Sequence, residues 1–289
     1  MAHTLGIACA LACALTTNLG FLYKHRGACA APAVDFRRPL WSARQLFRSK
    51  LFTVGMIVAC VSWSFHIGAM ALVPLSVVQA VLAGGVVMLA VMAERAFGLK
   101  IGPRQWMGLG MTAGGLVLLG ISLPAVHGAH SHFSVPGMVI FEGVLIVLGA
   151  LLIMGPRIGA SEHHHGVMLG GAAGILFGVS DVALKALTGA VGAHGIFGLV
   201  SPWLAVTIPA SVVAFYASAK SLQESEAVPV IAITATAANV SGILGGLLVF
   251  GDPLPSSAIG IVVETLAFAL VIVAAWFTPA PSRAVAVAV

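Results

Sequence analysis

Residues 51–72 read LFTVGMIVACVSWSFHIGAMAL and contain no Asp, Glu, Lys or Arg. As a helix rising 1.5 Å per residue, this stretch would be about 33 Å long. The hydrocarbon core of a bilayer is about 30 Å thick, so such a helix reaches from one face to the other. The stretch therefore predicts a transmembrane helix.

The composition of the whole chain extends this prediction. Of the 289 residues, 60% are hydrophobic and 8% are charged, and the mean hydropathy is +1.07. Soluble domains carry about 25% charged residues, so most of this surface does not face water. We expect an all-α integral membrane protein with one membrane domain over residues 1–289 and a short cytoplasmic tail at 278–289.

Further apolar runs of membrane-spanning length lie on both sides of residues 51–72. They predict about nine transmembrane helices. The expected spans are 4–23, 51–72, 74–94, 104–122, 135–154, 166–187, 196–217, 227–250 and 256–277.

The basic residues sort to one side of these nine spans. Seven of the 14 Lys and Arg residues lie between the first two spans, and six more fall on the same side of the membrane. Only Lys185 falls on the other side. Because cytoplasmic loops are enriched in Lys and Arg, this count predicts an outside N-terminus and a cytoplasmic C-terminus. The thirteen are Lys24, Arg26, Arg37, Arg38, Arg44, Arg48, Lys50, Arg95, Lys100, Arg104, Arg157, Lys220 and Arg283.

The segment 37–50 alternates apolar and basic residues at roughly helical spacing. This pattern is typical of a short helix lying on the inner leaflet, where anionic lipid headgroups would be its partner. The net charge of +5 has the same explanation, so we expect no nucleic-acid binding. We expect a multi-pass protein of the cell membrane, in a bacterial plasma membrane, with a homodimer as a possible assembly.

The two halves of the chain resemble each other. Four spans (4–122), one linker helix (135–154) and four more spans (166–277) place corresponding helices five apart, so they run in opposite directions. Such inverted repeats recur in secondary transporters, whose substrate site lies near the midplane between the halves. The paired features are Val73-Pro74 with Glu94, Val228-Pro229 with Asp252, and the polar segments Asn18 to Lys24 and Ser180 to Lys185.

These residues also carry a family resemblance. The segment PLSVVQA at 74–80, running to Ala93-Glu94-Arg95 and followed by a glycine-rich span, resembles the drug/metabolite transporter (EamA-like) superfamily. The nine spans and outside N-terminus look most like its NIPA-like magnesium-transporter branch and uncharacterised bacterial relatives. The resemblance implies a transporter fold and a small solute or cation as substrate.

One departure bears on the substrate. The resemblance to the magnesium branch implies a carboxylate within the second helix, where this chain reads Ser62-Trp-Ser-Phe-His66 without an acid. Magnesium prefers oxygen ligands that usually include carboxylates. We therefore expect a secondary transporter of a metabolite, a drug-like compound or a cation, with magnesium as the alternative.

Three carboxylates lie within predicted spans: Glu142, Asp181 and Glu264. Each lies roughly 9–12 Å from the outer end, at 1.5 Å per residue. Ionisable groups inside lipid are costly and mark functional sites by default. The three are candidates for one cation-binding or proton-coupling vestibule. The alternative is separate packing roles, with Lys185 neutralising Asp181 one helical turn away.

Polar and aromatic residues on the remaining spans are candidates for substrate binding. Gln79 follows the proline of a helix expected to line the cavity, and His66 is either a proton-coupling group or a hydrogen-bonded core histidine. Trp63 either flanks the same cavity or faces lipid. Asn18 and Asn239 are buried amides that either contact substrate or bond helices together.

Four glycines recur at every fourth position of the span 166–187. Three overlapping G-x-x-x-G units predict a helix face that packs closely on a neighbour. These glycines are Gly166, Gly170, Gly174 and Gly178.

Other function classes fit the sequence less well. It contains no H-E-x-x-H, no serine–lysine or paired-aspartate arrangement and no nucleotide-binding loop, so we expect neither an enzyme nor a cofactor. A non-transporting membrane scaffold, or an intramembrane enzyme for which only the three carboxylates could supply reactive groups, is the remaining alternative. A polar cavity between the halves that contains Gln79, His66 or Asn239 would favour transport, whereas a solid core would favour a scaffold.

Overall fold

The computed structural model describes residues 2–98, 101–122, 133–252 and 257–277. Over these residues the secondary structure is helical, with no strand, which confirms the all-helical prediction. The α-helices are α1 (Ala2–Cys29), α2 (Pro39–Arg48), α3 (Lys50–Leu72), α4 (Leu75–Arg95), α5 (Pro103–Ser122), α6 (Val135–Ile153), α7 (His165–His194), α8 (Pro202–Glu224), α9 (Ala227–Leu248) and α10 (Ala258–Phe277). Short 3₁₀ turns η1 (Gly155–Ile158), η2 (Glu162–His164) and η3 (Gly195–Leu199) complete the described structure.

Every predicted span falls on one of these helices, with shifts at the ends. By length and composition, α1, α3, α6, α7, α8 and α9 can cross a membrane, six helices among the described residues. The ranges 74–94, 104–122 and 256–277 fall mainly on α4, α5 and α10. The total of nine spans and their orientation remain predictions, and the expected tail at 278–289 lies outside the described residues.

The largest boundary error concerns α8. The sequence predicts a span at 196–217, whereas the helix covers Pro202–Glu224. The apolar residues at 196–200 lie mostly in η3 instead, and Ser201 begins α8 by accepting a hydrogen bond from the Trp203 N–H. A serine followed by a proline is a strong helix start, which overrides the apolar pattern used to place the span.

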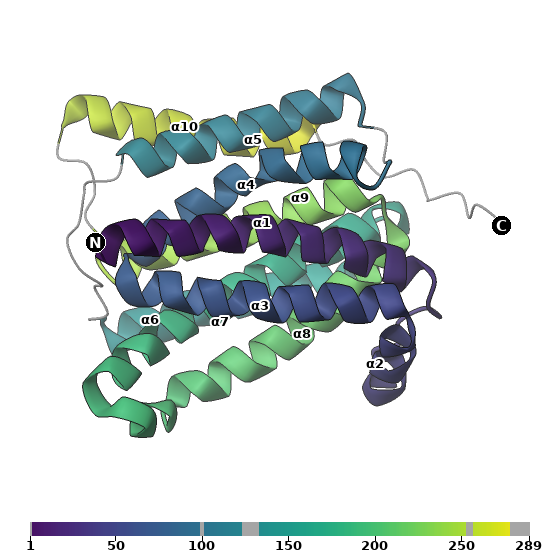
Figure 1. Cartoon of the computed structure of the whole chain (residues 1–289), viewed down its shortest axis with the longest axis horizontal. Coiled ribbons are helices and arrows are strands. Elements are labelled where there is room, and N and C mark those ends of the chain that lie inside the picture. The colour runs from purple at the N-terminus through teal and green to yellow at the C-terminus, as the bar shows by residue number, and fades with distance from the viewer. Residues whose placement is uncertain (1, 99–100, 123–132, 253–256, 278–289) are drawn as a thin grey trace.

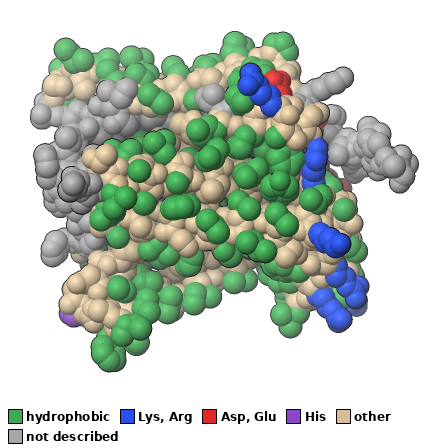
Figure 2. Space-filling view, in the orientation of Figure 1, with side chains coloured by type: hydrophobic (Ala, Val, Ile, Leu, Met, Phe, Trp, Pro, Cys, Tyr) green, Lys and Arg blue, Asp and Glu red, His purple; other side chains and the backbone are tan. Residues whose placement is uncertain are grey.

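The long helices run side by side as a bundle (Figure 1). In it α1 packs on α3 and α4, while α7 packs on α8 and α9. Helix α6 packs on α7, and α5 and α10 pack on each other at one edge. Hydrophobic side chains cover the middle of the face in Figure 2, and many Lys and Arg side chains gather at the end that carries α2.

The apolar core has two large parts, one towards each end of the bundle. Near the α2 end, Phe21, Phe52 and Leu222 belong to one buried cluster. Near the opposite end, Met70 and Phe250 belong to another. The space between the two clusters contains the candidate site.

Candidate functional site in a cavity between the helices

A cavity of about 480 Å³ lies between helices of both predicted halves. Helices α1, α3 and α4 line it on one side, and α7, α8 and α9 line it on the other. Its volume falls within the roughly 300–1,000 Å³ of small-molecule sites. The five candidate substrate-binding residues all line this cavity: Asn18, Trp63, His66, Gln79 and Asn239.

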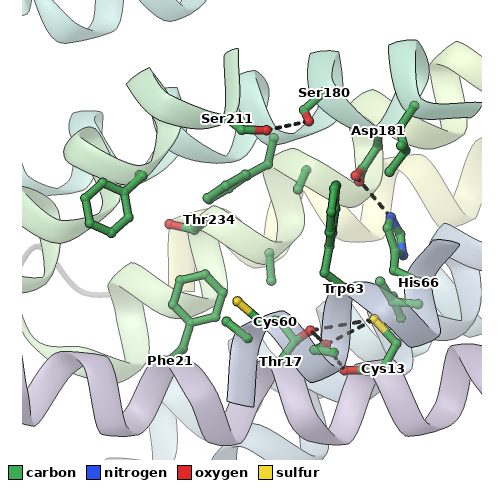
Figure 3. Close-up of a pocket in the computed structure, with 18 of the residues that line it drawn as sticks. Cys13, Thr17, Phe21, Cys60, Trp63, His66, Ser180, Asp181, Ser211 and Thr234 are labelled. Carbon is green, nitrogen blue, oxygen red and sulfur yellow. Dashed lines mark hydrogen bonds and ion pairs between the residues drawn. The ribbon is translucent and has the colours of Figure 1, made fainter. Parts of the chain in front are cut away.

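Asp181 of α7 forms the polar centre of the cavity. Its Oδ1 lies 3.0 Å from Nε2 of His66 on α3, and its Oδ2 accepts a hydrogen bond of 2.8 Å from Nε2 of Gln79 on α4. Figure 3 shows His66 pointing at Asp181 across the cavity. The Asp181 side chain is 16% exposed, against 6% for His66. The carboxylate is therefore held by the other half and still faces open space.

Gln79 presents an oxygen without a partner beside this carboxylate. Its side chain is buried, its Nε2 is engaged by Asp181, and its Oε1 has no hydrogen-bond partner. An unpaired buried carbonyl oxygen costs about 1–3 kcal/mol, so it favours a ligand that supplies positive charge or a donor. The oxygens of Asp181 and Gln79 thus suit a cation or a polar group of a solute.

Gly242 of α9 provides the space for Gln79. A Cβ at this position would lie 2.5 Å from Cγ of Gln79 and 2.8 Å from its Nε2. Gly242 was not predictable from the sequence, because the need for a glycine arises only from the approach of α4 to α9.

We expect Gly242→Ala to weaken substrate binding roughly tenfold. The added methyl displaces the flexible Gln79 side chain from Asp181, and a hydrogen bond to a charged group contributes about 1.5–3 kcal/mol. Substrate affinity of the purified variant measures the effect. Gly68→Ala is the matched control, because its Cβ would make only an ordinary contact of 3.8 Å with Cys9. Equal affinity in the two variants would contradict the role of Gly242.

The other candidate residues differ in what their side chains do. Asn18 donates to the carbonyls of Ala14 at 2.9 Å and Gly85 at 2.8 Å, so its amide nitrogen ties α1 to α4. Asn239 is buried in the cavity wall on α9. Trp63 is 49% exposed, so it lies at the rim between the cavity and the lipid-facing surface.

The structure does not bring the three intramembrane carboxylates together. Asp181 lines the cavity, whereas Glu142 on α6 and Glu264 on α10 are buried outside its described lining. The suggestion that Lys185 neutralises Asp181 is also wrong. The Nζ of Lys185 instead donates to backbone carbonyls at the end of α3. Both side chains face α3, where Asp181 contacts His66 and Lys185 reaches the carbonyls at the helix end.

Hydroxyl groups also line the cavity wall, and the sequence pattern did not predict them. Ser62 bonds to Cys13 and Thr17, which joins α3 to α1, and Ser180 bonds to Ser211 at 2.7 Å, which joins α7 to α8. Ser and Thr hydroxyls readily donate hydrogen bonds to backbone carbonyls of their own helix. Their presence in a span therefore does not predict a functional site.

The glycine stripe on α7 faces α8 and α9. A Cβ on Gly174 would lie 2.3 Å from the carbonyl oxygen of Thr234, and one on Gly178 would lie 2.3 Å from Cβ of Ser241. A Cβ on Gly166 would overlap the Ser225 hydroxyl at the end of α8, and one on Gly170 would lie 3.0 Å from Oγ of Ser221. These close approaches set the distances from α7 to α8 and α9, which line the cavity with it.

Comparison with known proteins adds one distant relative. The chain is 25% identical over 273 residues to the probable magnesium transporter NIPA9 of Arabidopsis thaliana, which covers 90% of this chain and 78% of the relative. Most of this chain is therefore similar to a probable transporter. No protein-family model and no solved structure matches it.

The likeness and the apolar helices together support a multi-pass membrane transporter. They are consistent with the expectation that the protein is not an enzyme. The superfamily suggested by the sequence, the lipid partner and the homodimer stay predictions.

Proposed function

We propose that this protein is a secondary transporter that moves a divalent cation, with magnesium as the first substrate to test. The proposal revises the order of the sequence-based expectations, which put a small organic solute first. The similarity to the probable magnesium transporter NIPA9 supports the revision, because it covers nine-tenths of this chain. The observation that carries the proposal is the carboxylate of Asp181 in a cavity between the two halves.

The position of Asp181 bears on the missing acid of the second helix and supports the magnesium proposal. That helix lacks an acid, but its His66 faces Asp181 of α7 at 3.0 Å. The position therefore has a carboxylate that comes from the other half of the chain. Asp181 is the one carboxylate among the described residues that line the cavity.

One carboxylate is sufficient for a hydrated magnesium ion. Magnesium dehydrates reluctantly, keeps several waters and is usually bound through one or two carboxylates. The cavity volume of about 480 Å³ greatly exceeds the roughly 10–15 Å³ that admits one water. The Oε1 of Gln79 and the hydroxyls of Ser180 and Thr234 offer oxygens to the ion's water shell.

The arrangement of the helices supports alternating access. Helix α1 packs on α3 and α4 as α7 packs on α8 and α9, and α4 meets α9 across the interface. This is the pairing expected of two inverted repeats with a site between them. Rocking of one half against the other would expose Asp181 to each side in turn.

Magnesium flux into proteoliposomes tests the proposal. We expect saturable uptake of Mg²⁺, followed with a magnesium-sensitive dye trapped inside, above the rate of protein-free liposomes. Inhibition of this uptake by external Ca²⁺ or Mn²⁺ would define the cation selectivity. Absence of Mg²⁺ flux from correctly folded protein would remove the magnesium proposal.

A small organic cation is the second candidate, because aromatic side chains line the same cavity as the Asp181 carboxylate. Phe21, Trp63, Phe177 and Phe215 line the cavity, and Trp63 is half exposed to the membrane side. Aromatic faces attract quaternary ammonium ions. Tetraethylammonium uptake that Mg²⁺ does not inhibit would favour this candidate over the first.

A further inference from the structure

Lys185 is a fully buried lysine in a membrane-spanning helix, outside the ion pair at Asp181. Its Nζ donates to the carbonyl oxygens of Met70 at 2.6 Å and Val73 at 3.1 Å. Met70 lies in the last turn of α3, and Val73 is the residue that ends it. The last carbonyls of a helix lack partners within the helix and attract positive charge. Lys185 therefore caps the C-terminus of α3 from the other half of the chain.

Asp252, just after α9, caps the next helix in the same way. Its Oδ2 accepts hydrogen bonds from the backbone N–H of Ser76 at 3.2 Å and from the Ser76 hydroxyl at 2.5 Å. Ser76 lies in the first turn of α4, which begins after Pro74 and has no side-chain cap of its own. A carboxylate at a helix N-terminus satisfies free N–H groups and complements the helix dipole.

Two glycines fit Asp252 to this position. Gly251, immediately before it, has a φ of +66°, a conformation that favours glycine. A Cβ on Gly246 would lie 2.5 Å from Oδ2 of Asp252 and 3.0 Å from the Ser76 nitrogen. The backbone of α9 thus approaches the start of α4 only because residue 246 has no side chain.

Both contacts hold the short α3–α4 connection, and they do so with opposite charges. Other helices in the protein begin with local caps, as Ser49, Ser134 and Ser201 show for α3, α6 and α8. The α3–α4 connection is capped in trans by the second half. Any separation of the halves at this end would leave both helix termini without these partners.

The connection lies at the end of the bundle opposite α2 (Figure 1). Lys185 is one turn from Asp181 along α7, and Ser76 is one turn before Gln79 along α4. At the α2 end the contacts between the halves include a charged group, the Glu226 carboxylate, which accepts a hydrogen bond from Gln105, as well as neutral ones. There Gln223 of α8 donates to the carbonyl of Ala28 at 2.9 Å.

We propose that Lys185 and Asp252 are positioning residues that hold the α3–α4 connection shut as a gate over the cavity. The proposal rests on the proposed transport function. When the two charges release the helix termini, the cavity opens at this end, and re-forming the contacts closes it. The charges act on the connection and do not touch the substrate.

A cysteine reporter in the cavity tests the gate. The reporter is Leu204→Cys on α8, near this end, in a background whose native cysteines are replaced by serine or alanine. Its rate of modification by a membrane-impermeant thiol reagent is measured separately from each face of oriented vesicles. We expect Lys185→Met and Asp252→Asn each to raise the rate at least about threefold from the face of the α3–α4 connection. Lys185→Arg should restore the parental rate.

Matched controls separate gating from general destabilisation. Gln223→Ala removes a contact between the halves at the α2 end, so it should not raise modification from the α3–α4 face. If Lys185→Met fails to fold, Ser76→Ala provides a second test. It deletes only the hydroxyl partner of Asp252, so it should increase modification less than Asp252→Asn does. Unchanged one-sided accessibility in folded Asp252→Asn and Ser76→Ala would overturn the gate. The rate of thiol modification does not depend on the substrate. If the variants raise that rate while the parent protein shows no Mg²⁺ flux, the gate is supported and only the magnesium proposal is rejected.

Discussion

Replacing Asp181 by asparagine is expected to reduce Mg²⁺ flux at least roughly tenfold. The substitution keeps the shape and the contact with Gln79 but removes the one negative charge among the described cavity residues. Truncating one partner of a buried charge pair costs about 2–5 kcal/mol, and about 1.4 kcal/mol is already tenfold in affinity. Initial uptake rates in proteoliposomes with equal amounts of folded protein measure the effect.

Two further variants define what the loss means. Glu162→Gln removes an exposed carboxylate in η2 and should transport like the parent. His66→Gln places a neutral hydrogen-bonding side chain opposite Asp181 and should preserve at least part of the flux. If Asp181→Asn transports at the parental rate, the cation does not use the carboxylate in this cavity.

Replacing Gly174 by alanine is expected to destabilise the protein by about 1–3 kcal/mol, the usual range for overpacking. The new Cβ would lie 2.3 Å from the backbone carbonyl oxygen of Thr234 and 2.7 Å from Cβ of Ala237. Backbone cannot rotate out of the way as a long side chain can, so α7 and α9 must move apart. Thermal unfolding of the detergent-solubilised protein measures the change.

The matched control lies on the same helix. Gly192 has no heavy atom within 4 Å of the position of an added Cβ. Gly192→Ala should be neutral or slightly stabilising, because alanine is a better helix former than glycine by about 1 kcal/mol. Equal unfolding temperatures for Gly174→Ala and the parent would show that the glycine stripe is not a tight packing face.

Several features of the site were predictable because they depend on local cost. Polar residues in apolar spans are conspicuous, and Asn18, His66, Gln79, Asp181 and Asn239 all proved to line one cavity. Burying such groups in lipid requires a partner or a ligand, so their presence marks the helix faces that do not meet lipid. The Ser and Thr residues that line the cavity could not be predicted in this way, because such residues are common in apolar helices.

The partners of these groups were not predictable. Spacing along α7 suggested that Lys185 neutralises Asp181, since residues four apart share a helix face. In the structure His66 and Gln79 reach Asp181 from α3 and α4, and Lys185 reaches the end of α3. Sequence separations of more than 100 residues lie between these partners, and no pattern along one helix contains that information.

The sequence by itself determined that this chain forms apolar helices of membrane-spanning length, because hydrophobicity and helix length are properties of each segment alone. It also identified the polar residues that such helices bury at a high cost. Only the tertiary structure decided that Asp181 meets His66 and Gln79, that Gly242 makes room for Gln79, and that Lys185 and Asp252 cap the helices of the opposite half. Those contacts arise where helices distant in the chain approach within a few ångströms, and the packing of whole helices sets that approach.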